Sequence, residues 1–379
     1  MRIGFDVSQT CEPKTGCAWF ADSLIKEIIQ IGTNDEFILY HHFGSLINKS
    51  TTKGTRIVKE NVHSPFINLS YTEAQRIWSD ENKLYNNLGE PDIVHANSFR
   101  CPKINGTKLV FTVYDMSFWD VPEFTTETNR TICQEGILDS LNNADAFIFI
   151  SDSTRNEFES LLPGWLKENN KPWIKIPVSP RRNIFYNKLE NFHNKPDKLK
   201  HNKFWLAVGS IEPRKNYDNL LDALELYWEK SKNKIPLVIA GGTGWKSTYT
   251  LKRIYELEAK GLIVYLGYVD DELLSYLYKN ALALIFPSFY EGYGLPVIEA
   301  LVNGCPVILS NHSTLQHFKT VGVNFIDHTN YQSIACELLK TENKLFSYIF
   351  KLLIRYINTL KVHKEKQGEI IYNFYKSLL

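Results

Sequence analysis

The sequence predicts an α/β protein built of two units, each with a parallel sheet covered by helices on both faces. The chain has 379 residues, more than one hydrophobic core normally organises. Short runs rich in β-branched and aromatic residues alternate with amphipathic stretches, which is typical of parallel sheets with helical crossovers. The alternation stops once, over Arg181–Lys203, and then restarts. We therefore expect one sheet on each side of that segment.

The first unit begins with a strand at Arg2–Val7 and a helix at Trp19–Gln30. That helix has an apolar side, formed by Phe20, Leu24, Ile25, Ile28 and Ile29. Further strands are predicted at Phe37–Tyr40, Ile93–His95, Leu109–Val113 and Ala146–Ile150, and helices at Glu127–Asn142 and Ser153–Leu161.

The second unit repeats the pattern after the Lys- and Asn-rich segment. Its strands are predicted at Phe204–Val208, Leu237–Ala240, Ile263–Leu266, Leu282–Phe286 and Pro306–Leu309. Its helices are predicted at Tyr217–Trp228, Lys246–Lys260, Asp271–Asn280 and Pro296–Val302. We expect domains at residues 1–180 and 204–360, a linker at 181–203 and a crossover helix at 361–379. Open α/β sheets bind ligands outside the carboxyl ends of their strands, so both units should present loops to a shared cleft.

The tail, Tyr331–Leu379, is interpreted as two or three helices. Lys351–Leu360 and Glu369–Leu379 carry apolar residues at helical spacing with lysines between them. Such a stripe usually packs on a core, and a face that lies on a membrane surface is the alternative.

Composition excludes several classes of protein. The 43 basic and 42 acidic side chains leave a net charge of +1, so no global attraction to nucleic acid is expected. The six cysteines form neither a CxxC pair nor a metal-site spacing, and we expect no bound metal. The N-terminus enters a strand directly, and no apolar run approaches the ~18 residues of a membrane span. A cytoplasmic protein is therefore expected.

The strongest candidate for a functional site is the string FPSFYEGYGLPVIEA, Phe286–Ala300. It places a strand end, a loop with two glycines around Tyr293, and a helix start with Pro296 in sequence. Glycines let backbone N–H groups approach a ligand, and a helix N-terminus favours negative charge. Glu291 and Glu299 would then bind hydroxyl groups of a polyhydroxylated, phosphate-carrying ligand. Taken alone, Glu299 could merely complement the helix dipole.

A second candidate, VGSIEPRKN (Val208–Asn216), also follows a strand. Arg214 and Lys215 could neutralise a diphosphate, Arg by its two-pronged donors and Lys as a point charge. The alternative is a solvated basic pair. Basic residues are disfavoured at helix N-termini, which favours the ligand.

These strings, with LVIAGGTGW and LGYVDDEL, closely resemble retaining glycosyltransferases of the GT-B fold, family 4, and most of all bacterial mannosyltransferases of surface-polysaccharide synthesis. GFDVSQ, FTVYDMSFWDVPEF and ADAFIFISDSTRNEF extend the resemblance to the N-terminal half. It implies two Rossmann-like α/β/α domains facing each other across a cleft, with the C-terminal helix packing back toward the N-terminal domain.

The resemblance also implies roles for individual residues. Glu291 would contact the donor sugar hydroxyls, Arg214 and Lys215 would hold the diphosphate, and Asp115 completes the catalytic group. Glu299 would bind the ribose. The remaining donor-binding residues would be Gly16, Gly209, Ser210, Gly242, Tyr268, Tyr293, Gly294 and Leu295.

Three positions depart from the family pattern. Tyr114 stands where many relatives have His before the Asp, which would change sugar preference or acceptor geometry. Ser210 stands where many have Arg, so Arg214 would carry that charge. Gln316–His317 replaces the usual Pro-Glu and weakens any role for that loop.

The expected reaction moves a hexose, with mannose from GDP-mannose as the lead, to a glycan or lipid-linked glycan, with retention and without metal or cofactor. Front-face attack is favoured over double displacement. The alternatives are a UDP-sugar donor and a catalytically degenerate nucleotide-sugar-binding subunit. A dinucleotide-binding oxidoreductase is disfavoured, because Gly241–Gly244 has the wrong glycine spacing and residues 1–30 lack the motif. Expected partners are other glycosyltransferases of the pathway and, peripherally, the inner membrane face.

Overall fold

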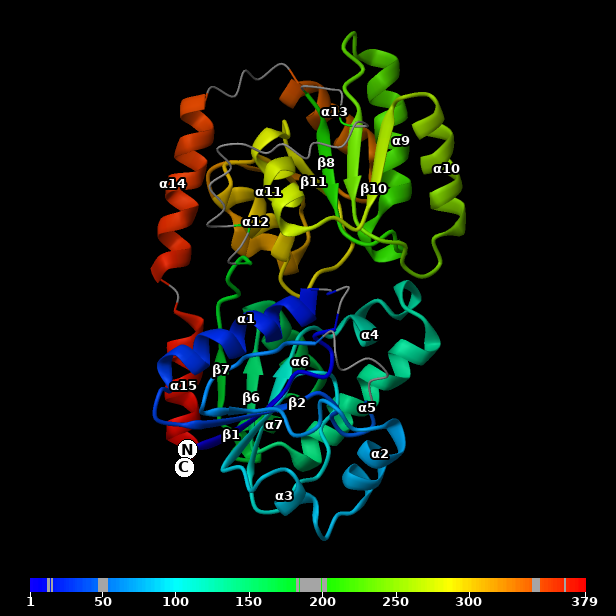
Figure 1. Cartoon of the computed structure of the whole chain (residues 1–379). Helices are drawn as coiled ribbons and strands as arrows, with labels where there is room; N and C mark the ends of the chain where they lie inside the picture. The colour runs from blue at the N-terminus through cyan, green and yellow to red at the C-terminus, as the bar shows by residue number, and fades with distance from the viewer. Residues whose placement is uncertain are drawn as a thin grey trace. The chain divides into compact units, whose positions relative to one another are not determined.

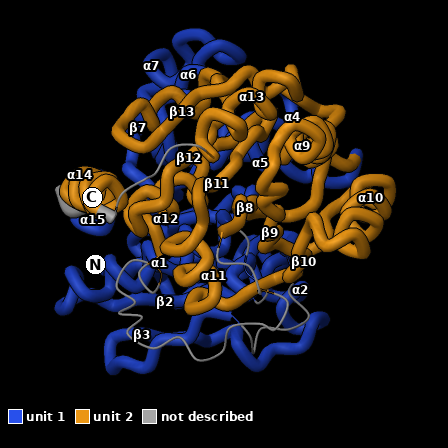
Figure 2. The backbone as a smooth tube through the Cα atoms, turned by 90° about the horizontal axis from the view of Figure 1, so that it is seen from above, with its two compact units in different colours: residues 1–120, 127–178, 366–379 blue, residues 121–126, 179–365 orange. Residues whose placement is uncertain are grey.

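The structure is a computed structural model (Figure 1), and it describes the chain except for residues 12, 13, 15, 47–53, 182, 183, 185–198, 200–202, 343–347 and 365. Most of the predicted linker 181–203 therefore lies outside the described residues. The chain divides into two compact units (Figure 2). Unit 1 comprises Met1–Asp120, Glu127–Val178 and Lys366–Leu379, and unit 2 comprises Val121–Thr126 and Ser179–Glu365.

Unit 1 contains a parallel sheet with the order β3-β2-β1-β4-β5-β6-β7 among its described residues. The strands are β1 (Arg2–Asp6), β2 (Glu36–Tyr40), β3 (Val62–His63), β4 (Ile93–Ala96), β5 (Lys108–Val113), β6 (Ala146–Phe149) and β7 (Trp173–Lys175). The sequence predicted β1, β2, β4, β5 and β6. It missed the short edge strands β3 and β7, which are only partly buried and so lack a continuous apolar run.

The helices of unit 1 cover this sheet. They are α1 (Gly16–Ile31), α2 (Tyr71–Ser79), α3 (Leu84–Asn87), α4 (Ser117–Asp120), α5 (Glu127–Asn143), α6 (Asp152–Leu161), α7 (Trp165–Glu168) and α15 (Gln367–Leu378). The C-terminal helix α15 packs against α1, where the Gly368 N–H donates to Glu27 at 3.1 Å. The expectation that the C-terminal helix packs on the N-terminal domain is confirmed.

Unit 2 contains a second parallel sheet, with the described strands in the order β10-β9-β8-β11-β12-β13. The strands are β8 (Trp205–Val208), β9 (Leu237–Ala240), β10 (Ile263–Gly267), β11 (Leu284–Phe286), β12 (Val307–Ser310) and β13 (Val323–Ile326). The helices are α9 (Tyr217–Lys230), α10 (Thr248–Ala259), α11 (Asp271–Asn280), α12 (Leu295–Val302), α13 (Tyr331–Glu342) and α14 (Tyr348–Lys364). Short 3₁₀ turns lie at Pro122–Phe124, Pro213–Lys215 and Ser313–Phe318. The strand predicted at Leu282–Phe286 begins at Leu284 in the structure. Strand β13 was not predicted.

Both faces of the second sheet are buried. Alternate strand residues pack into two different core clusters, as the pleat requires: Leu206, Val238, Leu284 and Val307 on one face and Trp205, Leu237, Ile285 and Ile308 on the other. This explains why these strands appear in the sequence as continuous apolar runs.

The strand order places a topological switch point between β8 and β11. From β8 the chain proceeds to β9 and β10 on one side, and β11 then pairs with β8 on the other side. The loops that follow the neighbouring strands β8 and β11 therefore lead in opposite directions. Open α/β sheets bind their ligands at such a point, outside the carboxyl ends of the strands. Among the described residues no helix is long and apolar enough to cross a bilayer.

Candidate active site

The loop after β8 carries the predicted basic pair. Gly209 has φ +141°, and a Cβ at this position would lie 3.1 Å from Cε of Lys215. The absence of a side chain therefore lets Lys215 fold back over the end of β8. Arg214 and Lys215 form the last residues of a 3₁₀ turn that begins at Pro213. The turn ends at Asn216, which adopts the left-handed conformation with φ +60°.

The loop after β11 carries Glu291. Its end is fixed by Gly294, which has φ +94° and is the N-cap of α12, with a proline in the first turn. The predicted sequence of strand, glycine loop and proline-initiated helix is confirmed. The Glu291 side chain is only 7% exposed.

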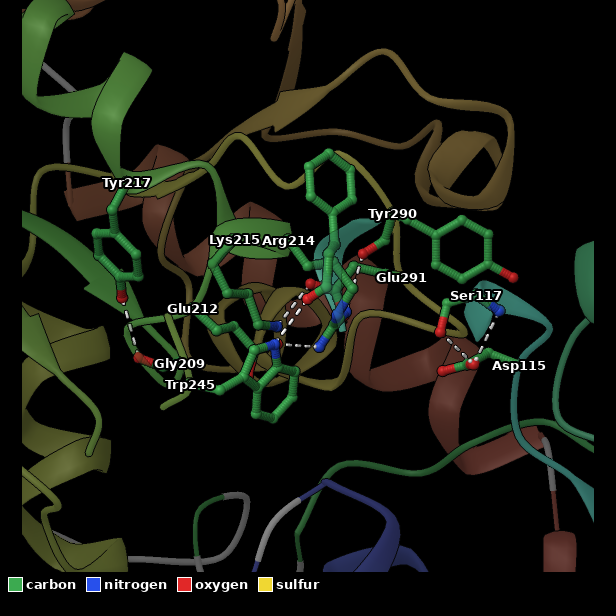
Figure 3. A network of polar contacts seen from close by, with 11 residues as sticks. Asp115, Ser117, Gly209, Glu212, Arg214, Lys215, Tyr217, Trp245, Tyr290 and Glu291 are labelled. Atoms are coloured by element: carbon green, nitrogen blue, oxygen red, sulfur yellow. Dashed lines mark hydrogen bonds and ion pairs between the residues drawn. The ribbon is translucent and has the colours of Figure 1, made fainter. Parts of the chain in front are cut away.

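Both basic side chains contact the Glu291 carboxylate (Figure 3). Nζ of Lys215 lies 2.6 Å from Oε1, and Nη1 of Arg214 lies 2.8 Å from Oε2. Arg214 also donates to the backbone carbonyl of Tyr290 at 2.9 Å and to the carboxylate of Glu212 at 2.7 Å. Glu291 is 77 residues from Arg214 and 76 from Lys215 in sequence, yet the three side chains form one cluster at the switch point.

This cluster sets the charge state of Glu291. Burial alone would raise its pKa, but the charges of Arg214 and Lys215 outweigh burial and hold the pKa at about 2 instead of 4.5. The carboxylate is therefore ionised over the whole neutral range, and it is suited to accept hydrogen bonds rather than to donate a proton.

Asn216 connects the two loops. Its Nδ2 donates to the carbonyl of Pro287 at 3.0 Å and to the carbonyl of His328 at 2.7 Å. The side chain is buried, so it fixes the loop after β8 against the loop after β11. Asn216 belongs to the predicted VGSIEPRKN motif, which assigned no role to it. An Asn that follows a basic pair and precedes a helix was the available signal.

Glu299 belongs to a different network. It lies within α12 and is fully buried. Arg181 donates to both of its carboxylate oxygens, through Nε at 2.6 Å and Nη2 at 2.9 Å, and the Tyr278 hydroxyl donates at 3.1 Å. Arg181 also pairs with Asp271 at 2.8 Å. Arg181 lies in the predicted linker, and its role cannot be predicted from the sequence because its partners are 90 and 118 residues away.

The other predicted donor-binding residues of unit 2 lie on loops and at a helix start. Gly242 follows β9, and a Cβ there would meet nothing within 4 Å. Tyr268 follows β10 and is half exposed. Tyr293 is partly buried beside the His317 ring, with centroids 4.8 Å apart. Ser210 and Leu295 are both partly buried.

Two of the predicted site residues, Gly16 and Asp115, lie in unit 1, as does Tyr114, the departure from the family pattern. Gly16 begins α1 and is exposed. Asp115 accepts hydrogen bonds from the backbone and hydroxyl of Ser117, at 3.1 and 2.8 Å, at the start of α4 (Figure 3). Tyr114 is 2% exposed and packs edge-on against Phe20. Tyr114 is thus part of the packing of its own unit.

A short segment between α4 and α5, Val121–Thr126, belongs to unit 2. Nε1 of Trp245 donates to the carbonyl of Phe124 at 2.6 Å, and Lys246 donates to the carbonyls on either side of it at 2.8 and 3.1 Å. The Phe124 ring stacks on Phe289, with centroids 4.8 Å apart. Residues 121–126 are therefore fixed beside the loop that carries the acidic residue, a relationship that sequence analysis did not predict.

The departure at Gln316–His317 lies in a 3₁₀ turn, where Gln316 donates to Asn311 at 2.6 Å. Within the described ranges, no three His, Cys, Asp or Glu side chains are grouped so that they could hold a metal ion.

Residues 189–344 match the family model described as glycosyl transferases group 1. The GT-B fold is also that of the solved structures to which the chain is similar. Anabaena HepE in complex with UDP and glucose has a TM-score of 0.67 at 14% identity and covers 100% of both chains. WaaG, a glycosyltransferase involved in lipopolysaccharide biosynthesis, has a TM-score of 0.66 at 13% identity and covers 98% of this chain and 99% of its own. The chain therefore has the GT-B fold, and its second half is similar to the glycosyl transferases group 1 family.

Several of the similar curated proteins are mannosyltransferases. O-antigen chain mannosyltransferase B of Escherichia coli is 27% identical over 360 residues, which cover 90% of each chain. O-antigen chain mannosyltransferase RfbU of Salmonella typhimurium is 31% identical over 158 residues, 41% of this chain and 43% of that protein. The predicted resemblance to bacterial mannosyltransferases of surface-polysaccharide synthesis is confirmed.

Proposed function

We propose that this chain is a retaining, metal-independent glycosyltransferase that transfers mannose from GDP-mannose to a glycan or a lipid-linked glycan. The observation that carries the proposal is the cluster of Glu291 with Arg214 and Lys215 at the switch point of the second sheet. The names of the similar curated proteins support mannose as the sugar and a polysaccharide as the product.

Charge on the leaving group explains the two cations. When a nucleotide sugar reacts, negative charge develops on the diphosphate as its bond to the anomeric carbon breaks. Arg214 and Lys215 extend from one turn and are only 20% and 12% exposed, so their charges are weakly screened. These two fixed cations can supply the neutralisation for which other transferases use a divalent metal.

Glu291 has a different role. Since Arg214 and Lys215 keep it ionised, its oxygens can accept hydrogen bonds from donor sugar hydroxyls and orient the ring. The same low pKa makes it a weak base and a weak nucleophile. This argues against a covalent glycosyl-enzyme on Glu291 and supports attack on the front face.

In that reaction the acceptor hydroxyl oxygen bonds to the anomeric carbon on the face from which the phosphate oxygen departs. The acceptor proton passes to the departing phosphate oxygen, so the products are the glycoside and the protonated nucleoside diphosphate. The sugar configuration is retained, and no carboxylate has to lose or gain a proton.

Thermal unfolding with GDP, UDP, ADP and TDP sugars tests the donor. A ligand at about 100 times its Kd adds about 2.7 kcal/mol to the free energy of unfolding. We expect the largest shift with GDP-mannose, followed by turnover that resists a metal chelator and gives an α-linked product by NMR. A larger shift with a UDP-sugar would mean that the donor is that UDP-sugar and not GDP-mannose. No shift with any sugar would favour the degenerate-subunit alternative.

Turnover in variants tests the site itself. Lys215→Ala and Glu291→Ala should abolish transfer, whereas Lys252→Ala and Glu256→Ala, which change exposed residues on α10, should not. Equal activity in all four variants would contradict the proposed site.

A further inference from the structure

Helix α14 has an apolar side that packs on its own unit. Ile354 is fully buried in the core of unit 2, and Phe350 packs against the same core. A Cβ at Gly304 would lie 2.6 Å from the carbonyl oxygen of Lys351, so the turn after α12 contacts the α14 backbone directly. Lys351 donates to the carbonyls of Lys279 and Ala281 at 3.2 and 2.9 Å. The helix is thus firmly docked along this side.

The opposite side of α14 is also apolar, but it is exposed. Its large hydrophobic residues follow one another at helical spacing and are between 43% and 76% exposed: Ile349, Leu352, Leu353, Tyr356 and Leu360. We call these five residues the α14 stripe. Helix α14 lies at the edge of unit 2 in both views (Figures 1 and 2). A surface helix normally presents polar residues to water on this side, so the stripe requires a partner.

The charge of α14 indicates what that partner is. Between Tyr348 and Lys364 the sequence contains four Lys and Arg residues and no Asp or Glu. Arg355 is exposed and flanks the stripe. Lys279, at the end of α11, lies beside α14, since its carbonyl oxygen accepts a hydrogen bond from Lys351 at 3.2 Å. Burial and then the Arg355 charge lower the pKa of Lys279. Positive charge therefore accumulates beside the exposed apolar residues.

We propose that the α14 stripe lies on the surface of an anionic lipid bilayer, with Arg355 facing the lipid phosphates. An apolar stripe bordered by basic residues is the pattern of helices that lie in the membrane interface, where apolar burial and attraction to anionic lipids act together. A second copy of the chain would juxtapose like charges, which argues against self-association. The inference does not depend on the proposed transfer activity.

Co-sedimentation of the full chain with vesicles tests the proposal. The vesicles consist of phosphatidylcholine alone or of equal parts of phosphatidylcholine and phosphatidylglycerol. We expect binding to the phosphatidylglycerol vesicles that weakens as salt is added. Leu353→Glu combined with Tyr356→Glu should lower the bound-to-free ratio by about tenfold or more. Arg355→Glu should weaken binding and reduce its dependence on salt.

The matched control is Tyr249→Glu, because Tyr249 on α10 is 67% exposed against 64% for Tyr356. It should bind vesicles as the wild type does, and all variants should keep the wild-type thermal unfolding. Failure of the wild type to bind, or equal binding by the double variant, overturns the proposal. Sedimentation equilibrium adds a third arm. A wild-type dimer that the double variant disrupts, without vesicle binding, would make the stripe an interface between copies and the proposal wrong.

Discussion

The guanidinium of Arg181 holds both carboxylate oxygens of Glu299 in a buried, two-pronged ion pair. The resemblance assigns Glu299 to the ribose of the donor, but here its oxygens contact Arg181 and Tyr278. A ribose hydroxyl would have to share or replace the Tyr278 hydroxyl. The pair also fixes the start of the main segment of unit 2 to α12, which follows the loop of Glu291.

Arg181→Ala should lower the free energy of unfolding by about 3–5 kcal/mol, because it leaves the Glu299 carboxylate buried without a cation. Urea unfolding measures the change. Arg253→Ala is the control, since Arg253 pairs with the half-exposed Asp222 and Glu225 and should cost about 1 kcal/mol or less. Adding Glu299→Gln to Arg181→Ala should recover part of the loss. Equal costs for the two Arg variants would mean that the buried pair contributes no more than a surface pair.

The sequence predicted local structure well where all the residues that determine it lie close together in the chain. The end of the strand, the glycine loop and the start of the helix around Glu291 lie within the fifteen residues Phe286–Ala300, and Gly294 and Pro296 have the backbone roles that their chemistry requires. The two-sheet fold followed from apolar periodicity. The edge strands β3, β7 and β13 were missed, because they are only partly buried and lack the continuous apolar runs of the central strands.

Long-range pairs could not be predicted in the same way. Arg214 and Lys215 were expected to contact a ligand, and the structure adds that both contact Glu291 directly. That contact depends on β8 and β11 being neighbours in the sheet, which only the strand order determines. The pairing of Arg181 with Glu299 also joins segments that share no sequence pattern.

Arg214→Lys should reduce kcat by about 100-fold while the Kd for the donor changes less. Arg214 contacts Glu291, Glu212 and the Tyr290 carbonyl at once, and a Lys ammonium lacks the planar fork that reaches all three. Loss of one charged stabiliser of a developing anion typically costs 10²–10³ in kcat. Steady-state kinetics and calorimetric titration with the nucleoside diphosphate separate the two effects. Wild-type kcat in Arg214→Lys would show that a point charge suffices.

Gly209→Ala should impair transfer more than it impairs folding. Its Cβ would lie 3.1 Å from Cε of Lys215, and φ +141° is rarely adopted by L side chains, so Lys215 is pushed away from Glu291. Gly241→Ala should instead destabilise the unit, since its Cβ would meet the Gly209 carbonyl oxygen at 1.9 Å. Gly242→Ala, which meets nothing within 4 Å, is the folding control. Thermal unfolding and turnover of the three variants distinguish these effects. A folded, fully active Gly209→Ala would contradict the positioning of Lys215 by this glycine.

Acid should destabilise the chain in two windows of pH. Burial lowers the pKa of His95 from 6.5 to about 3, so only the unfolded chain binds that proton between these values, and the free energy of unfolding falls as pH drops through this range. The two ring nitrogens of His95 contact the Tyr375 and Thr112 hydroxyls at 2.5 and 2.6 Å within this buried site. The contribution of Glu291 is fully present above pH 4.5 and is lost as pH falls toward 2, a change of about 3 kcal/mol.

Urea unfolding as a function of pH, in the wild type and two variants, resolves the two windows. His95→Gln should reduce the slope of the unfolding free energy between pH 6.5 and 4.5, although His41, His42 and His328 shift in the same direction and keep part of it. Glu291→Gln should leave that upper window unchanged and flatten the window below pH 4.5, because it removes the carboxylate that Arg214 and Lys215 hold ionised. A wild-type slope below pH 4.5 in Glu291→Gln would mean that this carboxylate is not bound by the two cations in solution, and the mechanism built on them would be wrong.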